Sequence, residues 1–205
     1  MDAGIPVTVF DSGLDLTGYV TFVATDNYGA GVIAARKLAE LMHKPGGMST
    51  GDRECAFEAT MAKEFPAIQI VDRRYGMADR AKSRDAAENI LTAHPDLDGM
   101  FASAEANSLG AMQAIKARGM SGKIKLVTFD LSDEHVAALK DGTINVMLVQ
   151  DPHRIGYEAV HSLVMKLNGQ TPPRQMDLKA RVIVKQDLDK PDVQALLFPK
   201  WRDQK

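Results

Sequence analysis

The stretch LVQDPHRIG, residues 148–156, places the end of an apolar run directly before a helical pattern. The mainly apolar run 144–149 is typical of a buried strand, and it ends in the amide of Gln150. A strand that leads into a helix through so short a turn presents its last side chain at the edge of a sheet. Ligands bind at that edge in open α/β sheets. Gln150 is therefore a candidate ligand-binding residue.

Outward from this stretch, short β-rich runs alternate with helical patterns, which is typical of βαβ units and a mainly parallel sheet. The spacing of apolar residues predicts helices over 28–42, 51–64, 80–93, 106–118, 132–140 and 153–168. The predicted strands are 7–10, 20–24, 68–71, 99–102, 125–129, 144–149 and 181–184. The expected fold class is α/β.

One predicted helix lacks the strand that the alternation leads us to expect. The helix 28–42 runs into KPGGMSTGDRE (44–54), whereas every other predicted helix is followed by a β-rich run. Either residues 41–43 form a stub strand, or a strand is missing. The prolines of GQTPPRQ (169–175) predict a loop, and the tail 191–205 is weakly specified.

Composition and charge exclude several classes of protein. The 205 residues are 45% hydrophobic and carry a net charge of -2, so no polybasic surface argues for nucleic acid or an anionic membrane. No apolar run approaches the roughly 20 residues that span a bilayer. The single cysteine, Cys55, provides neither an internal disulfide nor a metal cluster. The first ten residues lack signal-peptide features, so the chain as written is expected to stay in the cytoplasm.

Polar residues collect at the ends of the predicted strands and at one glycine-rich helix start. Because parallel strands have their carboxyl ends on one rim, we expect these side chains to line a common site. Carboxylates accept from hydroxyl groups, a guanidinium donates in a planar fork and an amide does both, which suits a neutral polyol. The alternative is that the acidic members are helix caps or turn residues. The candidates are Asp11, Ser12, Arg53, Glu105, Asp130 and Gln150.

Motifs of catalysis are missing from the sequence. It contains no G-x-S-x-G elbow and no H-E-x-x-H, and GGMSTG (46–51) lacks the frame of a phosphate-binding loop. The five histidines are scattered along the chain. We therefore expect a binding module rather than an enzyme, with no catalytic residue, metal or cofactor.

Five motifs follow one another in an order that resembles the type I periplasmic sugar-binding proteins, and the ribose-binding group in particular. The resemblance extends to about residue 184, and it implies two Rossmann-like parallel-sheet lobes joined by a hinge, with a sugar between them. It also implies a periplasmic location and an ABC-transporter permease as partner. The motifs are AGIPVTVFDS (3–12), FVATDNYGAGVIAARKLAEL (22–41), LTAHPDLDGMFASAEANSLGAMQAIKARG (91–119), VTFDLS (127–132) and LKDGTINVMLVQDPHRIGYEAV (139–160).

Residue by residue, the resemblance keeps some sugar-binding positions and alters others. Ser12 stands where ribose binders have arginine, Ala78 where they often stack an aromatic ring, and Ala104 where they place an asparagine. Glu105 follows at a position that is commonly acidic. The expected ligand is therefore a sugar or polyol for which ribose is not the best choice. The positions that match are Asp11, Arg53, Asp130 and Gln150.

The resemblance further implies that the first three βα units of the first lobe are absent. We expect residues 1–26 to be a remnant of the first lobe and 27–148 to be the second lobe. Residues 149–178 would then return to the first lobe, and 179–205 would add a strand and a tail to the second. Exposed strand edges would favour self-association. Two alternatives are an effector-sensing domain of a LacI-type regulator and a truncated remnant that binds nothing.

Overall fold

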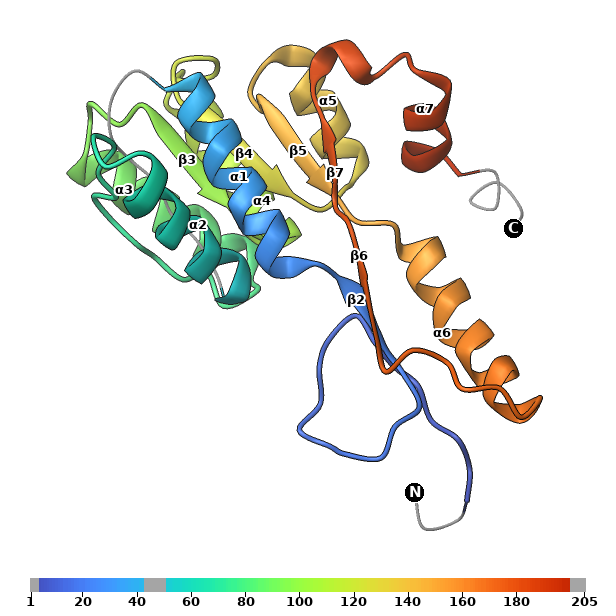
Figure 1. The fold of residues 1–205 in the computed structure, drawn as a ribbon. Coiled ribbons are helices and arrows are strands. Elements are labelled where there is room, and N and C mark those ends of the chain that lie inside the picture. Colours follow the sequence, from blue (N-terminus) through green and yellow to red (C-terminus); the bar gives the residue numbers. More distant parts are fainter. Residues whose placement is uncertain (1–3, 43–50, 200–205) are drawn as a thin grey trace. The chain divides into compact units, whose positions relative to one another are not determined.

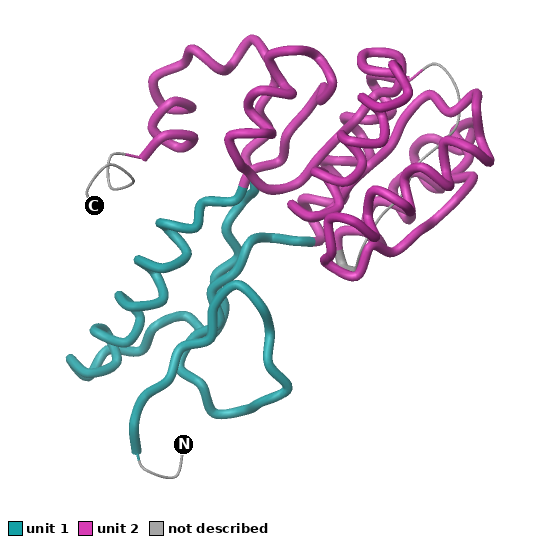
Figure 2. Tube along the Cα trace, turned by 180° about the vertical axis from the view of Figure 1, so that it is seen from behind, with its two compact units in different colours: residues 1–27, 150–180 teal, residues 28–149, 181–205 magenta. Residues whose placement is uncertain are grey.

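Two sheets of mainly parallel strands organise the protein (Figure 1). The structure is a computed structural model that describes residues 4–42 and 51–199. Two compact units divide the chain, and each is assembled from segments far apart in the sequence (Figure 2). The expected α/β fold class is confirmed in both. Unit 1 contains Met1–Asn27 and Gln150–Ala180, and unit 2 contains Tyr28–Val149 and Arg181–Lys205.

Unit 1 is a three-stranded parallel sheet with one helix against it. Ile155 and Ala159 of the helix pack on Val23 in the middle strand, and Met176 and Leu178 complete this small core. The elements are β1 (Val9–Phe10), β2 (Phe22–Thr25), α6 (Pro152–Leu167) and β6 (Gln175–Leu178), with strand order β1-β2-β6.

Unit 2 is a four-stranded sheet between helical layers. Its strand order is β3-β4-β5-β7, in which the first three strands are parallel and β7 is antiparallel to β5. Every residue of β3 and β5 is buried, as expected for strands covered on both faces. The strands are β3 (Gly99–Ala102), β4 (Lys125–Phe129), β5 (Val146–Val149) and β7 (Arg181–Ile183). The helices are α1 (Asn27–Leu41), α2 (Gly51–Glu64), α3 (Arg80–Ala93), α4 (Glu105–Ala117), α5 (Asp133–Asp141), the short 3-10 turn η1 (Lys185–Asp187) and α7 (Pro191–Leu197).

Alternate residues of β3 show which helices cover each face of this sheet. Met100 and Ala102 belong to an apolar cluster that includes residues of α3 and α4. On the other face, the ring of Phe101 stacks on Phe57 of α2, with ring centroids 4.9 Å apart. A Cβ on Gly99 would lie 2.9 Å from the side chain of Leu38 in α1 and 2.5 Å from that of Met42, the residue after α1, so the end of α1 lies directly on that face.

The structure confirms the six predicted helices and differs from the sequence-based prediction at residues 68–71, at β6 and at α7. Residues 68–71, predicted to be a strand, form none, because no neighbouring strand in the described residues offers them hydrogen-bond partners. Strand β6 begins inside the segment predicted to be a loop, and helix α7 lies in the weakly specified tail. The stub strand considered for residues 41–43 does not form at Leu41, which ends α1, and His43 lies outside the described residues.

The crossing of α3 and α4 depends on Gly110. A Cβ at this position would lie 2.5 Å from the backbone nitrogen of Arg84 and 2.6 Å from the Cβ of Ser83. Such a contact with backbone atoms is relieved only if one helix moves. Gly110 therefore sets how closely the two helices approach.

We predict that Gly110→Ala destabilises the protein by about 1–3 kcal/mol, because the added methyl group overpacks the α3–α4 contact. Gly156→Ala in α6 is the matched control, since its Cβ would meet nothing within 4 Å. That control should be neutral or stabilising by up to about 1 kcal/mol, the helix-propensity difference between the two residues. Urea unfolding measures both, and equal stability of the two variants would contradict the packing argument.

Helix α6 carries a second apolar stripe away from its core-facing side. The stripe consists of Tyr157, Val160, Val164 and Leu167, which repeat at three and four residues and are 47–72% exposed. Apolar side chains in a continuous exposed patch favour association with another surface.

We predict that the chain self-associates at micromolar concentration and that replacing Val160 and Val164 by glutamate makes it monomeric. Lys166→Glu on the same helix controls for the added negative charge, because it leaves the stripe intact. Light scattering after size exclusion gives the mass of each species. A wild-type chain that elutes as a monodisperse monomer would refute the prediction.

Candidate ligand-binding site

Arg53 lies where the carboxyl ends of β3 and β4 meet in unit 2. It is the third residue of α2, and its Nη1 donates a hydrogen bond to the carbonyl oxygen of Ser103 at 2.7 Å. The guanidinium carbon lies 3.5 Å from the ring centroid of Phe129, the last residue of β4. A cation over an aromatic face is attracted by the ring quadrupole, and here the ring is fully buried. The two contacts hold the guanidinium at the ends of both strands.

Gly31, which is not among the predicted site residues, allows α1 and α2 to approach closely enough to place Arg53 here. A Cβ on Gly31 in α1 would lie 2.1 Å from the carbonyl oxygen of Arg53. Helices α1 and α2 therefore touch backbone to backbone at the first turn of α2. Glycine inside an otherwise helical pattern was the available signal, because such a residue commonly has a packing reason.

Asp130 joins the ends of two successive βα units. It follows β4 directly, and its Oδ2 accepts a hydrogen bond from the backbone nitrogen of Glu105 at 3.1 Å. The N-cap residue of α4 is Ala104, which has no side-chain acceptor. The carboxylate of Asp130, from the next βα unit along the chain, performs that role. Asp130 is thus a helix cap, but it caps α4, which precedes it in the chain, and not α5, which follows it.

Ser108 is a buried residue that joins the backbone segments at this edge, and no sequence pattern marks it as a candidate. Its Oγ lies 2.9, 3.3 and 3.2 Å from the carbonyl oxygens of Ala104, Ala102 and Phe129. One hydroxyl thus reaches β3, β4 and the start of α4. This arrangement fixes the backbone on which Arg53 and Asp130 depend.

The other three predicted residues lie in unit 1. Asp11 follows β1, and its backbone nitrogen donates to Val23 at 2.8 Å, while the hydroxyl of Ser12 donates to its Oδ2 at 3.3 Å. The side-chain Oε1 of Gln150 accepts a hydrogen bond from the hydroxyl of Thr25 at 2.6 Å. Thr25 is the buried last residue of β2, one position beyond the strand predicted from sequence. It fixes the orientation of the Gln150 amide.

Both predicted aspartates adopt a left-handed backbone conformation immediately after a strand. The φ angle is 62° at Asp11 and 72° at Asp130. A non-glycine residue in this region costs about 1 kcal/mol or more, and aspartate tolerates it better than most residues. Such strained positions cluster at binding sites. Ala78, which stands at an altered position of the resemblance, has a φ of 55° and is exposed.

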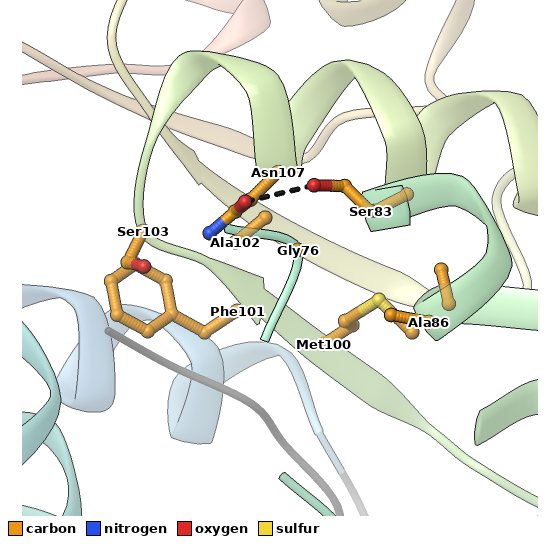
Figure 3. A pocket seen from close by; sticks show the side chains of 10 residues that line it. Gly76, Ser83, Ala86, Met100, Phe101, Ala102, Ser103 and Asn107 are labelled. Carbon is orange, nitrogen blue, oxygen red and sulfur yellow. Dashed lines mark hydrogen bonds between the residues drawn. The ribbon is translucent and has the colours of Figure 1, made fainter. Parts of the chain in front are cut away.

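Two cavities in the described part of unit 2 are lined by other residues than the predicted ones. A cavity of about 20 Å³ lies beside β3 and has room for a single water-sized molecule (Figure 3). It contains Ser103 but none of the six candidates. A larger space of about 310 Å³ is lined by Gly142 and Asn145, which precede β5, and by Lys185, which follows β7. It does not lie at the carboxyl end of β4.

The described residues offer little support for other kinds of site. In residues 4–42 and 51–199, no group of three or more His, Cys, Asp or Glu side chains could hold a metal ion. None of the helices in the same ranges is long and apolar enough to cross a membrane.

Comparison with known families identifies the class of protein. The family profile described as "Periplasmic binding protein domain" matches residues 1–171, and the chain belongs to this family. The ribose import binding protein of Bacillus subtilis is 30% identical over 176 residues, which cover 81% of this chain and 56% of that protein. That of Escherichia coli is 27% identical over 90% of this chain and 64% of its own length. The chain thus spans somewhat less than two thirds of these relatives.

Solved structures show the same fold. An ABC-transporter solute-binding protein from Agrobacterium vitis with bound alpha-D-tagatopyranose has a TM-score of 0.89 and 29% identity, covering 97% of this chain and 73% of that one. A second from the same organism, with bound D-fucose, has a TM-score of 0.87 and 30% identity, covering 96% and 72%. The expected fold of two Rossmann-like lobes is confirmed. The relatives are binding proteins rather than enzymes.

The first turn of α5, shortly after Asp130, contains a buried histidine. His135 is fully buried, and its Nδ1 lies 2.7 Å from the hydroxyl of Ser132, the N-cap residue. Desolvation lowers the pKa of His135 to about 4, against the opposing influence of Asp130 and Glu134. Its imidazole is therefore neutral at neutral pH.

We predict that the protein loses stability as the pH falls. The pKa of His135 is about 4 in the folded chain against 6.5 in the unfolded chain, so the unfolded chain binds more protons between these values. Stability from this residue is complete above the unfolded pKa and decreases below it, by about 2 kcal/mol between pH 7.5 and pH 5. Urea unfolding across this range measures the loss. The variant His135→Gln should flatten the profile while the exposed control His153→Gln keeps it, and an unchanged slope in His135→Gln would sink the assignment.

Proposed function

We propose that this chain is the solute-binding component of an ABC-type importer and that it binds a neutral sugar or polyol. The observation that carries the proposal is the position of the Arg53 guanidinium, which is held over Phe129 at the end of β4, directly before Asp130 with its carboxylate. Its relatives support the class of ligand, because they are named for ribose import or hold a bound sugar.

The chemistry of the six residues suits hydroxyl groups without a net charge. The carboxylates of Asp11, Glu105 and Asp130 accept hydrogen bonds, and the guanidinium of Arg53 donates them. Gln150 does both through its amide, whose orientation Thr25 sets. Charge-assisted hydrogen bonds of this kind are roughly twice as strong as neutral ones. Because protein contacts already hold Arg53, Asp130 and Gln150, little side-chain freedom is lost on binding.

We propose that residues of both units contact one ligand. Unit 1 contributes Asp11, Ser12 and Gln150, and unit 2 contributes Arg53, Glu105 and Asp130. A ligand that contacts both sets favours the conformations in which both reach it, and this preference links binding to conformation. We propose a transporter permease as the partner of the ligand-bound form and the periplasm as its location. No observation on this chain favours the LacI-type alternative.

The altered positions shape the expected specificity. Ser12 provides one hydroxyl where an arginine would provide several donors, and this hydroxyl is bonded to Asp11. Ala104 presents no polar group at the start of α4. A ligand hydroxyl that loses its partner loses much of its binding energy. Ribose is therefore not expected to be the best ligand.

A panel of sugars and polyols tests the function directly. Thermal shift with ribose, tagatose, fucose, arabinose and inositol should show stabilisation by at least one compound other than ribose. Ribose as the strongest stabiliser would contradict the specificity. The absence of any shift across the panel would contradict the function and favour the non-binding remnant.

We predict that Asp130→Ala weakens binding of the preferred sugar by about 1–3 kcal/mol, because ligand donors are left without an acceptor. Asp130→Asn separates the two roles of this residue, since its amide oxygen can still accept from the Glu105 nitrogen while its charge is lost. Asp96→Ala, in an exposed loop before β3, is the control and should bind as the wild type. Isothermal titration measures all three, and unchanged affinity in Asp130→Ala would remove this residue from the site.

A further inference from the structure

A short hydrogen bond inside unit 1 sets the direction of the Gln150 amide. The Oγ1 hydroxyl of Thr25 donates to Oε1 of Gln150 at 2.6 Å. Bonds from a hydroxyl to an oxygen are usually about 2.7–2.8 Å long, whereas bonds from an amide nitrogen to an oxygen are about 2.9–3.0 Å long. A separation of 2.6 Å therefore favours the amide oxygen, and not the amide nitrogen, as the atom beside Thr25.

Both residues are held by contacts within their own unit. Thr25 is 4% exposed and ends β2, where it lies opposite Leu178 of β6. Branching at its Cβ restricts the χ1 angle, so the hydroxyl oxygen has few positions to adopt. Gln150 directly precedes Asp151, whose carboxylate caps α6 by accepting from the backbone nitrogen of Arg154 at 2.9 Å. The bond therefore joins the end of β2 to the start of α6.

The direction of the amide determines which of its two polar groups is turned away from Thr25. The oxygen and the nitrogen of a primary amide are bonded to the same carbon, and the nitrogen carries two hydrogens and is no acceptor. With the oxygen toward Thr25, the Nε2 hydrogens of Gln150 lie on the other side of that carbon. An amide turned over would place Nε2 at 2.6 Å from the hydroxyl oxygen, which is below the roughly 2.7 Å lower limit of N–H···O bonds.

We propose that Thr25 is a positioning residue that makes Gln150 a hydrogen-bond donor to the ligand. This inference rests on the proposed function, in which Gln150 contacts a sugar or polyol. The group that meets Gln150 is then an oxygen with a lone pair, such as a hydroxyl, ring or carbonyl oxygen. A protonated amine at that point has no lone pair, so two donors would face each other. The site thus rejects amino sugars that place their nitrogen at this position.

The variant Gln150→Glu tests this direction, because its carboxylate accepts from Thr25 but has no hydrogen to donate. The affinity for sugar should fall by about tenfold or more. Isothermal titration at neutral pH uses those of ribose, tagatose, fucose, arabinose and inositol that bind the wild type. Gln170→Glu, in an exposed loop of unit 1, adds the same charge and should bind as the wild type. Unchanged or higher affinity in Gln150→Glu would show that the amide oxygen meets the ligand, and would overturn the proposal.

Two substitutions of Thr25 separate positioning from folding. Thr25→Val keeps the shape of the side chain but removes the hydroxyl, so the amide can turn over and the affinity should fall by about threefold to tenfold. Thr25→Ser keeps a hydroxyl and should recover most of this loss. In the Gln150→Ala background Thr25→Val should cause no further loss, because no amide is left to position. A full additional loss in that background, or equal affinity of Thr25→Val and the wild type, would contradict the positioning role.

The contact itself can be tested without any sugar. A carbonyl carbon shifts to higher frequency when its oxygen accepts a hydrogen bond, so the side-chain carbonyl resonance of Gln150 reports on the bond in the isotope-labelled full chain. Thr25→Val should lower this chemical shift, and Thr25→Ser should leave it near the wild-type value. An unchanged resonance in Thr25→Val would overturn the inference. If the resonance responds but none of the sugars binds, the proposed function fails and the donor role fails with it, although the geometry of the amide holds.

Discussion

The hydrogen bond from the backbone of Glu105 to the carboxylate of Asp130 is the constraint on which the candidate site of unit 2 depends. It links the start of α4 to the end of β4, and so it connects two βα units that are otherwise joined through their strands. Ser108 reinforces the same junction from inside the sheet. Arg53 then lies on this framework through Ser103 and Phe129. The geometry of this site is set by side chains that bind backbone groups at the ends of β3 and β4.

The two units differ in how they stabilise their share of the site. Unit 2 has a large apolar cluster between its strands and helices, so its edge rests on a large core. Unit 1 has a core of Val23, Ile155 and Ala159 with two partly buried neighbours. A small core contributes little free energy of folding, because buried apolar area is the main favourable term. The residues Asp11, Ser12 and Gln150 therefore sit on the less stable of the two frameworks.

Much of the fold follows from periodicity, and the exceptions share a physical cause. Helix α3 begins and ends where its apolar spacing predicts, and the strands at 99–102 and 125–129 coincide with β3 and β4. Residues 68–71 have the composition of a strand, but strand formation requires a neighbour, which composition does not reveal. In β6, QMDL shows half-buried residues alternating with exposed ones, a weak signal for an edge strand.

Five of the six candidate residues follow predicted strands, and Arg53 lies at a glycine-rich helix start. The rule of strand ends places Glu105 and Asp130 at one edge, since consecutive parallel strands share a rim. It did not indicate Thr25, Ser108 or Gly31, because these residues act through contacts with chain segments distant in sequence.

The order of segments along the chain has a consequence for folding during synthesis. Strand β6 completes the sheet of unit 1 and β7 completes that of unit 2, and both come after residue 174. A ribosome that has reached residue 170 has therefore finished neither sheet, although the helices from α1 to α6 are already present. Pairing between such distant segments forms slowly, because long loops must close before the contacts form. Until β6 and β7 are made, both units have open strand edges, and in this interval the nascent chain is most prone to aggregate or to need a chaperone.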